Sequence, residues 1–354
     1  MSSFPLVSII TPSYNQAAFL EATIHSVLAQ DYAPVEYLIV DGGSTDGSVE
    51  IIQRYADRLA WWVSERDSGQ AEAINKGLQR ARGEVVAWLN SDDLYLPGAI
   101  SQAVAALQED PELGMVFSDA ITIDAQGKPL NELSFGDWGL LELVSFRIIC
   151  QPAVFMRRVV LEEAGYLDRG YHFMLDHQLW IRMARCAPIR YIGALPLTSM
   201  HLTAGPWAAA RHHAGAKNVA QAASFGRETM LVLDWMETQP DLSALINQNR
   251  RRVLSGAYRL NARYLLDDGL PGPALASYWK ALINRPSYAL KHWQRMAYAL
   301  LCLLKLDRLS RPFQARRTRQ RRERLVAHLR QLELPAASPA RKGLEDWPGL
   351  SLEL

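Results

Sequence analysis

Two adjacent carboxylates in a short polar segment are the first feature of this 354-residue sequence that could carry chemistry. Asp92 and Asp93 close the run Asn90-Ser-Asp-Asp, which directly follows the apolar residues 85–89. Adjacent carboxylates repel each other unless a cation or solvent offsets their charge. Mg²⁺ and Mn²⁺ prefer oxygen ligands and bridge one or two carboxylates to diphosphate oxygens. The run therefore predicts either a divalent-metal site or a solvated turn that caps the following helix.

Other polar residues are candidates for binding or catalysis. Asp41 precedes two glycines, so its carboxylate could bind a base or ribose, or could hold a tight turn. Asp176 begins an apolar helical run, where an acidic residue is more often a cap than a base. His201 could complete a metal site, although a lone histidine is more often structural. His212 and His213 have no partner at metal-binding spacing, so we expect them at the surface.

Short apolar runs alternate with amphipathic helical segments in the first 120 or so residues, and polar residues follow the apolar runs. This alternation predicts a mostly parallel sheet covered by helices. Ligands bind such sheets at the carboxyl ends of the strands, where the polar residues fall. The expected strands are residues 6–11, 35–40, 59–64, 85–89 and 115–118, and the expected helices are residues 19–30, 49–55 and 69–81, with one more after Pro97.

The rest of the chain is predicted to be increasingly helical. Helical pieces are expected at residues 140–146, 158–164 and 175–184, and strand signals largely vanish from about Ala208 onward. We therefore predict three parts: an α/β domain over residues 1–207, a helical region over 208–334 and a loosely ordered tail over 335–354. Within the helical region one helix pair resembles a tetratricopeptide unit, on the residues Tyr258, Ala262, Leu265, Ala274, Tyr278, Ala281 and Pro286.

Four segments in order resemble the family 2 inverting glycosyltransferases, which have the GT-A fold. The segments are Val-Ser-Ile-Ile-Thr-Pro-Ser-Tyr-Asn (7–15), Val-Asp-Gly-Gly-Ser-Thr-Asp-Gly-Ser (40–48), Asn-Ser-Asp-Asp (90–93) and Ser-Glu-Arg-Asp-Ser-Gly-Gln-Ala-Glu-Ala-Ile-Asn-Lys-Gly (64–77). The last of these is similar to the subgroup found in bacterial cell-surface polysaccharide assembly. The resemblance covers about residues 5–205.

The resemblance implies a donor site at the strand ends. Pro12, Tyr14 and Asp41 would line the nucleoside pocket, with Asp41 facing the base. Asp67 falls in a loop that closes this pocket in similar enzymes. The run from Asn90 and Ser91 to Asp92 occupies the family's D-x-D position, with Asn in place of the first Asp. By this resemblance Asp92, helped by Asp93, holds a divalent metal (Mn²⁺ or Mg²⁺) against the diphosphate, and His201 is a further metal ligand or diphosphate contact.

The acceptor side is implied in the same way. Residues 151–157 resemble the family's acceptor-side segment, which places Gln151 there together with Trp180. Asp176 matches the position of the catalytic base. The implied reaction moves a sugar from a nucleotide-sugar donor, with UDP-sugars favoured, to a hydroxyl of a glycan or lipid-linked glycan, with inversion at the anomeric carbon.

Two other functions compete with this interpretation. A catalytically degenerate GT-A module that acts as a binding or scaffold protein is favoured by Asn90 and by the acid-poor segment around Asp176. A nucleotidyltransferase is the second alternative, but such enzymes usually carry a Gly-rich, basic loop after the first strand. Here that loop reads Pro-Ser-Tyr-Asn-Gln.

Bulk composition limits location and partners. The chain is 49% hydrophobic and 21% charged with a net charge of +1, which is typical of a globular protein and does not favour nucleic acid as a partner. Three scattered cysteines, no secretory signal and no run of about 18 apolar residues predict a cytoplasmic protein. The basic residues 316–324 and the apolar residues 296–304 predict peripheral contact with the cytoplasmic face of the inner membrane, or else a core helix followed by a solvated basic helix.

Overall fold

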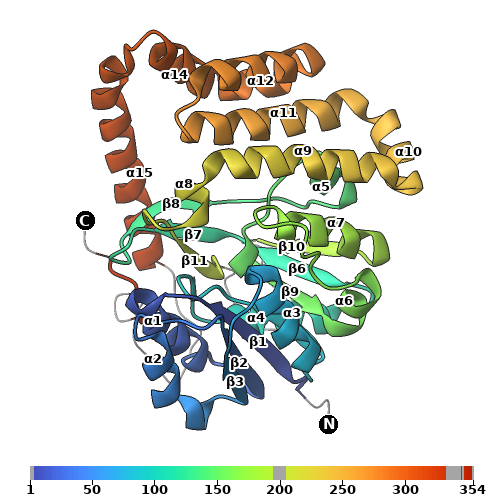
Figure 1. The fold of residues 1–354 in the computed structure, drawn as a ribbon, viewed down its shortest axis with the longest axis vertical. Helices are drawn as coiled ribbons and strands as arrows, with labels where there is room; N and C mark the ends of the chain where they lie inside the picture. The colour runs from blue at the N-terminus through green and yellow to red at the C-terminus, as the bar shows by residue number, and fades with distance from the viewer. Residues whose placement is uncertain (1–3, 194–204, 332–343, 345–346, 353–354) are drawn as a thin grey trace.

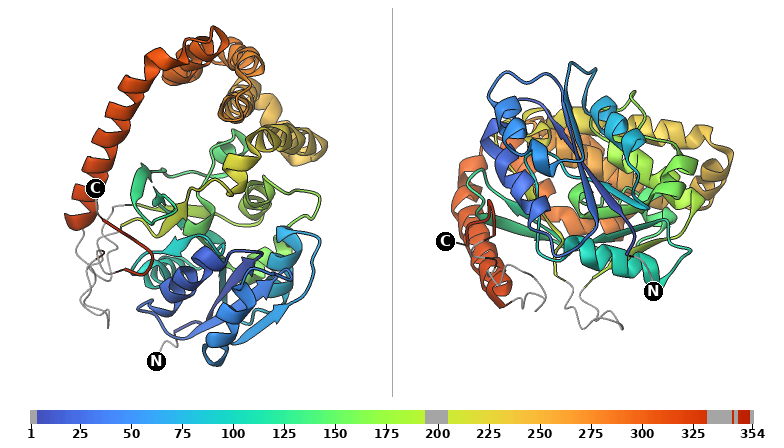
Figure 2. Two further views of the ribbon diagram at one scale, coloured as in Figure 1. Left: turned by 60° about the vertical axis from the view of Figure 1, so that its left-hand side comes forward. Right: turned by 90° about the horizontal axis from the view of Figure 1, so that it is seen from below.

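The computed structural model describes residues 4–193, 205–331, 344 and 347–352. An α/β unit forms one half of the molecule, and a stack of long helices lies over one side of it (Figure 1). The last long helix returns from the far end of that stack to the α/β unit (Figure 2). None of the described helices combines the length and the apolar composition that crossing a membrane requires.

A seven-stranded sheet forms the centre of the α/β unit. The sheet is mostly parallel, as predicted, and only β9 runs antiparallel to its neighbours. In order across the sheet the strands are β10 (Ile189–Ile192), β6 (Met115–Ser118), β9 (Val154–Arg157), β4 (Val85–Trp88), β1 (Val7–Ser13), β2 (Val35–Asp41) and β3 (Trp61–Ser64).

Apolar cores cover both faces of this sheet. Successive side chains of a strand point to opposite faces, so Ile9 and Ile10 of β1 are fully buried in different cores. Gly77 lets α3 lie directly on β1, because a Cβ atom there would approach Ile10 Cγ2 to 2.5 Å. The covering helices are α1 (Ala17–Leu28), α2 (Ser48–Arg54), α3 (Gln70–Arg80), α4 (Ala99–Glu109), α5 (Leu140–Val144), α6 (Arg158–Ala164) and α7 (Leu175–Cys186).

A second, four-stranded sheet was not expected from the sequence. Its order is β5 (Leu94–Tyr95), β11 (Ala208–Arg211), β7 (Ala120–Ile123) and β8 (Pro129–Leu133). The prediction that the chain is helical from Ala208 onward is therefore wrong for β11, which pairs with β5 and β7. The predicted boundary at residues 207/208 falls inside this sheet, and the α/β unit extends at least to Arg211.

The helical region begins after β11. Helices α9, α11 and α12 pack side by side, and α11 with α12 forms the helix pair that the tetratricopeptide-like residues predicted. Ala262, Ala274, Tyr278 and Ala281 are buried between these helices and α14. The helices are α8 (Lys217–Ala220), α9 (Ala222–Thr238), α10 (Pro240–Gln248), α11 (Arg250–Asp267), α12 (Pro271–Asn284), α13 (Pro286–Ala289), α14 (Trp293–Leu303) and α15 (Arg311–Gln331).

The described residues of the C-terminal tail pack against the second sheet. Trp347 is 3% exposed, and its indole Nε1 donates to the Tyr95 carbonyl oxygen at 2.7 Å. Leu350 and Leu352 are buried in the same cluster, together with Leu325 of α15. The expectation of a loosely ordered tail is thus wrong for residues 347–352, because these apolar side chains complete a core that the second sheet and α15 leave open.

Candidate active site

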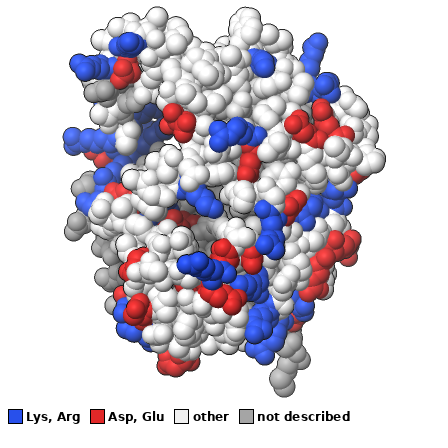
Figure 3. Space-filling view, in the orientation of Figure 1, with Lys and Arg blue, Asp and Glu red and all other residues white. Residues whose placement is uncertain are grey.

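The predicted donor residues gather where β1, β2 and β4 end, as the rule for parallel sheets requires. Pro12 is buried near the end of β1, opposite Val40 of β2, while the next loop carries Tyr14 with 63% of its surface exposed. The molecular surface is hollowed near the middle of the face shown in Figure 3, and charged side chains of both signs border this hollow.

Asp41 is buried at the end of β2 and is fully engaged with its own loop. Its Oδ2 accepts hydrogen bonds from the backbone N–H groups of Gly43 (3.1 Å) and Ser44 (2.8 Å) and from the Ser64 hydroxyl (2.7 Å). Its Oδ1 accepts the Ser44 hydroxyl at 2.5 Å. In this structure the Asp41 carboxylate therefore holds the tight turn of the glycine-rich loop, which is the second of the two roles that the sequence allowed for it.

Gly42, Tyr14 and Asp67 meet beside Asp41. A Cβ atom on Gly42 would lie 2.7 Å from Asp67 Oδ2 and 3.3 Å from the Tyr14 ring. The Asp67 Oδ1 atom accepts the N–H of Gly69 at 2.9 Å, which holds the loop in place before α3. The absence of a side chain at residue 42 thus lets the Asp67 carboxylate and the exposed Tyr14 ring approach the backbone closely.

Asp92 contacts a histidine that the sequence did not single out. The Nε2 atom of His213 lies 3.1 Å from Asp92 Oδ2, and the two side chains are only 11% and 20% exposed. The expectation that His213 is a surface residue is wrong, because its ring packs on Phe19 with a centroid separation of 4.7 Å. His201, the predicted metal ligand, lies outside the described residues. Within the described residues no group of three or more His, Cys, Asp or Glu side chains is arranged to hold a metal.

Asp93 has a different environment from its neighbour. It is 6% exposed, and its Oδ1 accepts the backbone N–H of Arg211 at 2.8 Å. Burial and the adjacent charge of Asp92 raise the pKa of Asp93 well above its usual range. The guanidinium of Arg211 donates to the Asp92 carbonyl oxygen at 2.9 Å, so β11 fixes the whole acidic loop. Asp93 is therefore a structural acid, and Asp92 is the more exposed of the two carboxylates.

Asn90, in the D-x-D position, is the centre of a hydrogen-bond network. Its Nδ2 donates to Gln151 Oε1 at 3.1 Å and to Asp93 Oδ2 at 3.2 Å, and its Oδ1 accepts from Gln70 at 2.8 Å. Gln151 is 9% exposed and donates to the Trp88 carbonyl oxygen at 2.7 Å, so its amide positions Asn90. Ser91 is buried beneath this network, at 4% exposure.

Lys217 brings a positive charge to the same loop cluster. Its Nζ donates to Gln70 Oε1 at 2.9 Å, which links α8 to the Asn90 network. Burial lowers the pKa of Lys217, and three nearby carboxylates oppose that shift. They belong to Glu228, Asp92 and Asp67.

Asp176 is partly buried at the start of α7, where the sequence predicted it. Its Oδ1 accepts the backbone N–H of His177 at 2.7 Å. Burial, followed by a smaller contribution from the charge of Glu228, raises the pKa of Asp176 to about 6. Burial, followed by the charges of Asp93 and Asp176, raises the pKa of the Cys150 thiol, so both acids lie near this cysteine. A carboxylate with this pKa can accept a proton near neutral pH.

Glu228 of α9 supports the loop that leads to Asp176. Its carboxylate accepts the consecutive N–H groups of His172 (2.9 Å), Phe173 (2.8 Å) and Met174 (2.8 Å). These residues immediately precede α7, so the helical region fixes the position of the predicted base. Nothing in the local sequence around Glu228 indicates this role, because the contact spans more than fifty residues.

Trp180 does not face an acceptor. It is 1% exposed and stacks on Trp88 with ring centroids 5.1 Å apart. Its contact with Trp88 of β4 places Trp180 on the side of α7 that packs against the sheet. This burial corrects the prediction that Trp180 lies on the acceptor side.

Solved structures of other proteins share this fold. S. aureus TarS 1–349 in complex with UDP-GlcNAc has a TM-score of 0.54 and 16% identity, and the match covers 85% of this chain and 89% of that one. The mannosyltransferase PcManGT from Pyrobaculum calidifontis, in complex with GDP-Man and Mn²⁺, has a TM-score of 0.54 and 20% identity, over 86% and 88% of the two chains. The fold is thus the GT-A fold of nucleotide-sugar transferases, as expected.

Sequence comparison points to one family of enzymes. Residues 8–163 match glycosyl transferase family 2. The putative teichuronic acid biosynthesis glycosyltransferase TuaG of Bacillus subtilis is 44% identical over 131 residues, which cover 36% of this chain and 52% of TuaG. The chain spans less than two thirds of the length of such relatives, and only 32% of one uncharacterized glycosyltransferase of Rickettsia conorii. This match agrees with the predicted resemblance to family 2 glycosyltransferases over residues 8–163.

Proposed function

We propose that this protein transfers a sugar from a nucleoside-diphosphate donor to a hydroxyl of a glycan or lipid-linked glycan. The observation that supports this proposal most is that two carboxylates with different surroundings lie in one candidate site. Asp92 is accessible and paired with His213, whereas burial gives Asp176 a pKa of about 6. One carboxylate can hold a cation against a diphosphate, and the other can accept a proton.

Asp92 and His213 are the residues that would hold a divalent cation. Their contacting atoms, a carboxylate oxygen and an imidazole nitrogen 3.1 Å apart, suit Mn²⁺ or Mg²⁺ bound jointly with diphosphate oxygens. Such a cation would supply positive charge to offset the negative charge on the departing diphosphate. Asn90, Gln70 and Lys217 form a polar wall beside this pair and would orient the phosphates.

Asp176 would act as the general base in a single displacement. The acceptor hydroxyl gives its proton to the Asp176 carboxylate as its oxygen forms a bond to the anomeric carbon. The bond from that carbon to the diphosphate oxygen breaks on the opposite side, and the nucleoside diphosphate leaves. The configuration at the anomeric carbon is thereby inverted. Glu228 would keep Asp176 in position through its three backbone hydrogen bonds.

The donor base and the acceptor are proposed by similarity. UDP-sugars are favoured because the motifs resemble enzymes of bacterial cell-surface polysaccharide assembly, and TarS was solved with UDP-GlcNAc. PcManGT was solved with GDP-Man and Mn²⁺, so GDP-sugars belong in any donor screen. TuaG is named for teichuronic acid biosynthesis, which supports an envelope polysaccharide as the class of acceptor.

Incubation of the purified protein with UDP- and GDP-sugars, with Mn²⁺, with Mg²⁺ and with EDTA, tests this proposal. We expect metal-dependent release of nucleoside diphosphate from one donor, measured by mass spectrometry, and inversion in the product, measured by NMR. The Asp176→Asn protein is the control for catalysis. Tight binding of nucleoside diphosphate without turnover of any donor would instead favour a degenerate binding or scaffold module.

Peripheral membrane contact at the cytoplasmic face is the second part of the proposal. α14 buries only Ala299, while Trp293 (58%), Leu300 (49%) and Leu303 (50%) are exposed. The alternative of a core helix does not fit this exposure. The following α15 is rich in arginine, and its apolar residues Val326 and Leu329 pack against the second sheet. Exposed apolar residues beside basic ones favour contact with an anionic bilayer.

Liposome flotation tests this contact. We expect the wild-type protein to float with vesicles of anionic lipid and to remain in solution with phosphatidylcholine alone. Replacing both Leu300 and Leu303 with Ser should abolish flotation without changing the nucleotide affinity, because these residues lie outside the site. Equal recovery in the soluble fraction with both kinds of vesicle would contradict membrane contact.

A further inference from the structure

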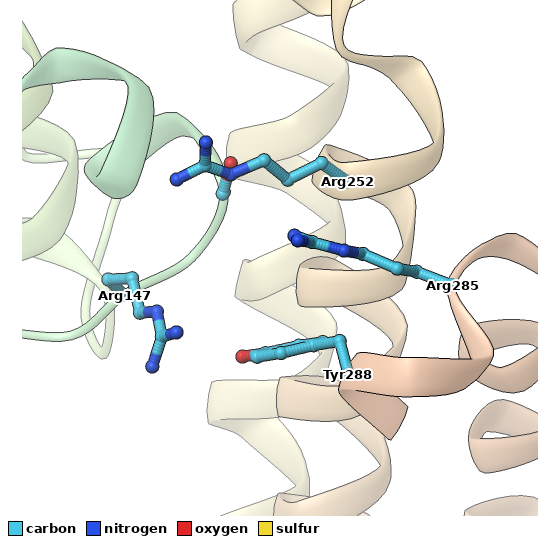
Figure 4. Close-up of a pocket in the computed structure, with 5 residues that line it drawn as sticks. Arg147, Arg252, Arg285 and Tyr288 are labelled. Atoms are coloured by element: carbon cyan, nitrogen blue, oxygen red, sulfur yellow. The ribbon is translucent and has the colours of Figure 1, made fainter. Parts of the chain in front are cut away.

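A separate cavity of about 170 Å³ lies between the α/β unit and the helical region. Ser145 and Arg147 line it from the segment after α5, Arg252 lines it from α11, and Arg285 and Tyr288 line it from the end of α12 and from α13. Figure 4 shows the three guanidinium groups and the Tyr288 hydroxyl converging on one open space. At ~30 Å³ per water molecule, the cavity has room for several waters or for one tetrahedral anion.

The charges around this cavity are unbalanced. Arg252 pairs with Glu142, but Arg147 and Arg285 have no carboxylate partner among the described residues. Instead their guanidinium groups lie over the Tyr288 ring, at 5.2 and 5.8 Å from its centroid. Three positive groups therefore face a single acid, in an arrangement that attracts anions.

A buried hydroxyl in the wall lacks a partner. Ser145 is 5% exposed, and its Oγ makes no hydrogen bond with any described residue. An unpaired buried hydroxyl costs free energy, which a bound acceptor atom would recover. The wall itself is held rigidly, because α11 approaches so closely that a Cβ atom on Gly256 would overlap the Ser145 carbonyl oxygen.

The surrounding residues add to the positive field. Arg259 lies behind the cavity, where it donates to the Phe146 carbonyl oxygen at 3.0 Å, and its Nε has no partner among the described residues. Burial, followed by the charges of Arg259, Arg295, Arg147 and Arg263, lowers the pKa of His292 to about 4. Arg263 and Arg295 already pair with Asp267, so the positive field at this histidine comes mainly from Arg147 and Arg259.

We propose that this cavity is a binding site for a phosphoryl group, bound by Arg147, Arg252, Arg285 and the hydroxyl of Ser145. Arginine binds phosphate oxygens through two parallel N–H donors, and donors that approach from both halves of the molecule suit a tetrahedral anion better than a planar carboxylate. The site is distinct from the donor site, whose acidic residues Asp92 and Asp176 do not line it. The phosphoryl group comes either from a soluble phosphate compound or from a phospholipid, since the exposed Leu290 and Trp293 follow Tyr288 closely.

Calorimetric titration tests the site without relying on glycosyl transfer. Inorganic phosphate and pyrophosphate are titrated separately into the full chain at constant ionic strength, with EDTA present so that the metal-dependent site stays silent. We expect saturable binding, weakened about tenfold or more in Arg147→Gln and in Arg285→Gln, the effect of losing a charge-assisted hydrogen bond. Both arginines are exposed, so these variants should fold. Arg251→Gln, an exposed neighbour on α11, is the matched control and should bind like wild type.

Two further measurements identify the compound that carries the phosphoryl group and separate this proposal from the proposed glycosyl transfer. Flotation with vesicles that contain phosphatidic acid, compared with phosphatidylglycerol at equal charge, shows whether a lipid phosphate monoester occupies the cavity. Binding of UDP with Mn²⁺ should be unchanged in Arg147→Gln and Arg285→Gln. The proposal is overturned if phosphate binding survives in both variants, if Arg251→Gln weakens it equally, or if glucuronate binds as tightly as phosphate.

Discussion

The end of β4 and the start of α7 both carry aspartates of the candidate site, but these aspartates differ in burial and in hydrogen-bond partners. At the end of β4, Asp92 stays partly exposed and contacts His213, while Asp93 is buried against β11. At the start of α7, Asp176 has no ion-pair partner among the described residues, and burial raises its pKa to about 6. The same side chain can therefore favour a cation at one position and accept a proton at another, according to its surroundings.

The largest expected effect tests the base at the start of α7. Asp176→Asn keeps the size of the side chain and removes the proton acceptor, so transfer should fall by roughly a hundredfold or more. The affinity for nucleoside diphosphate with Mn²⁺ should stay at the wild-type value. Product formation at saturating donor and calorimetry measure the two quantities. Transfer close to the wild-type rate would make Asp176 structural and would remove the contrast between the two regions.

The next effect separates the two acids at the end of β4. Asp92→Ala and His213→Ala should each weaken Mn²⁺-dependent binding of nucleoside diphosphate by about tenfold or more, because each loses a proposed ligand. Asp93→Asn should change this affinity little, because the Asp93 carboxylate is buried and engaged with Arg211 and Asn90. Calorimetry with and without Mn²⁺ measures the difference. A larger loss in Asp93→Asn than in Asp92→Ala would reverse the proposed assignment.

A smaller effect concerns the acidic limb of the pH profile. Transfer should rise with pH through about 6, as Asp176 loses its proton. The negative charge of Glu228 contributes to the raised pKa, so Glu228→Gln should move this limb to lower pH. Glu228→Gln should reverse only part of the rise in the pKa of Asp176 from 3.8 to about 6, because burial is the larger cause of that rise.

Rates across a range from pH 5 to pH 8 test the role of Glu228. Glu237→Gln, an exposed change on the same helix, is the control. A role of Glu228 in stability alone would lower the rate equally at every pH, without moving the limb.

The smallest effect is expected at Trp180, which the sequence placed on the acceptor side. Trp180→Phe keeps an aromatic ring against Trp88 and removes a buried indole N–H that has no partner among the described residues. We expect kcat and KM for the acceptor to change by less than about twofold, since the ring lies in the core. A selective rise in the acceptor KM would restore the acceptor-side assignment.

The sequence by itself determined the features that depend on local pattern. Alternating apolar runs predicted the parallel strands, and the polar residues after them predicted the positions of Asp41 and Asp92. These predictions hold because burial on both faces of a strand requires a continuous apolar run, and the residue that follows such a strand reaches the sheet edge whatever the rest of the chain does.

Only the tertiary structure decided which distant residues complete the site. His213 lies 121 residues from Asp92 and reaches it because β11 pairs into the second sheet just before it. The sequence did not predict this strand, because its short run of alanines is also typical of a helix. Glu228 reaches the loop before α7 across more than fifty residues. The arginine cavity combines three separate segments of the chain. Such contacts depend on how whole elements pack, and neither periodicity nor the spacing of residues along one element records that packing.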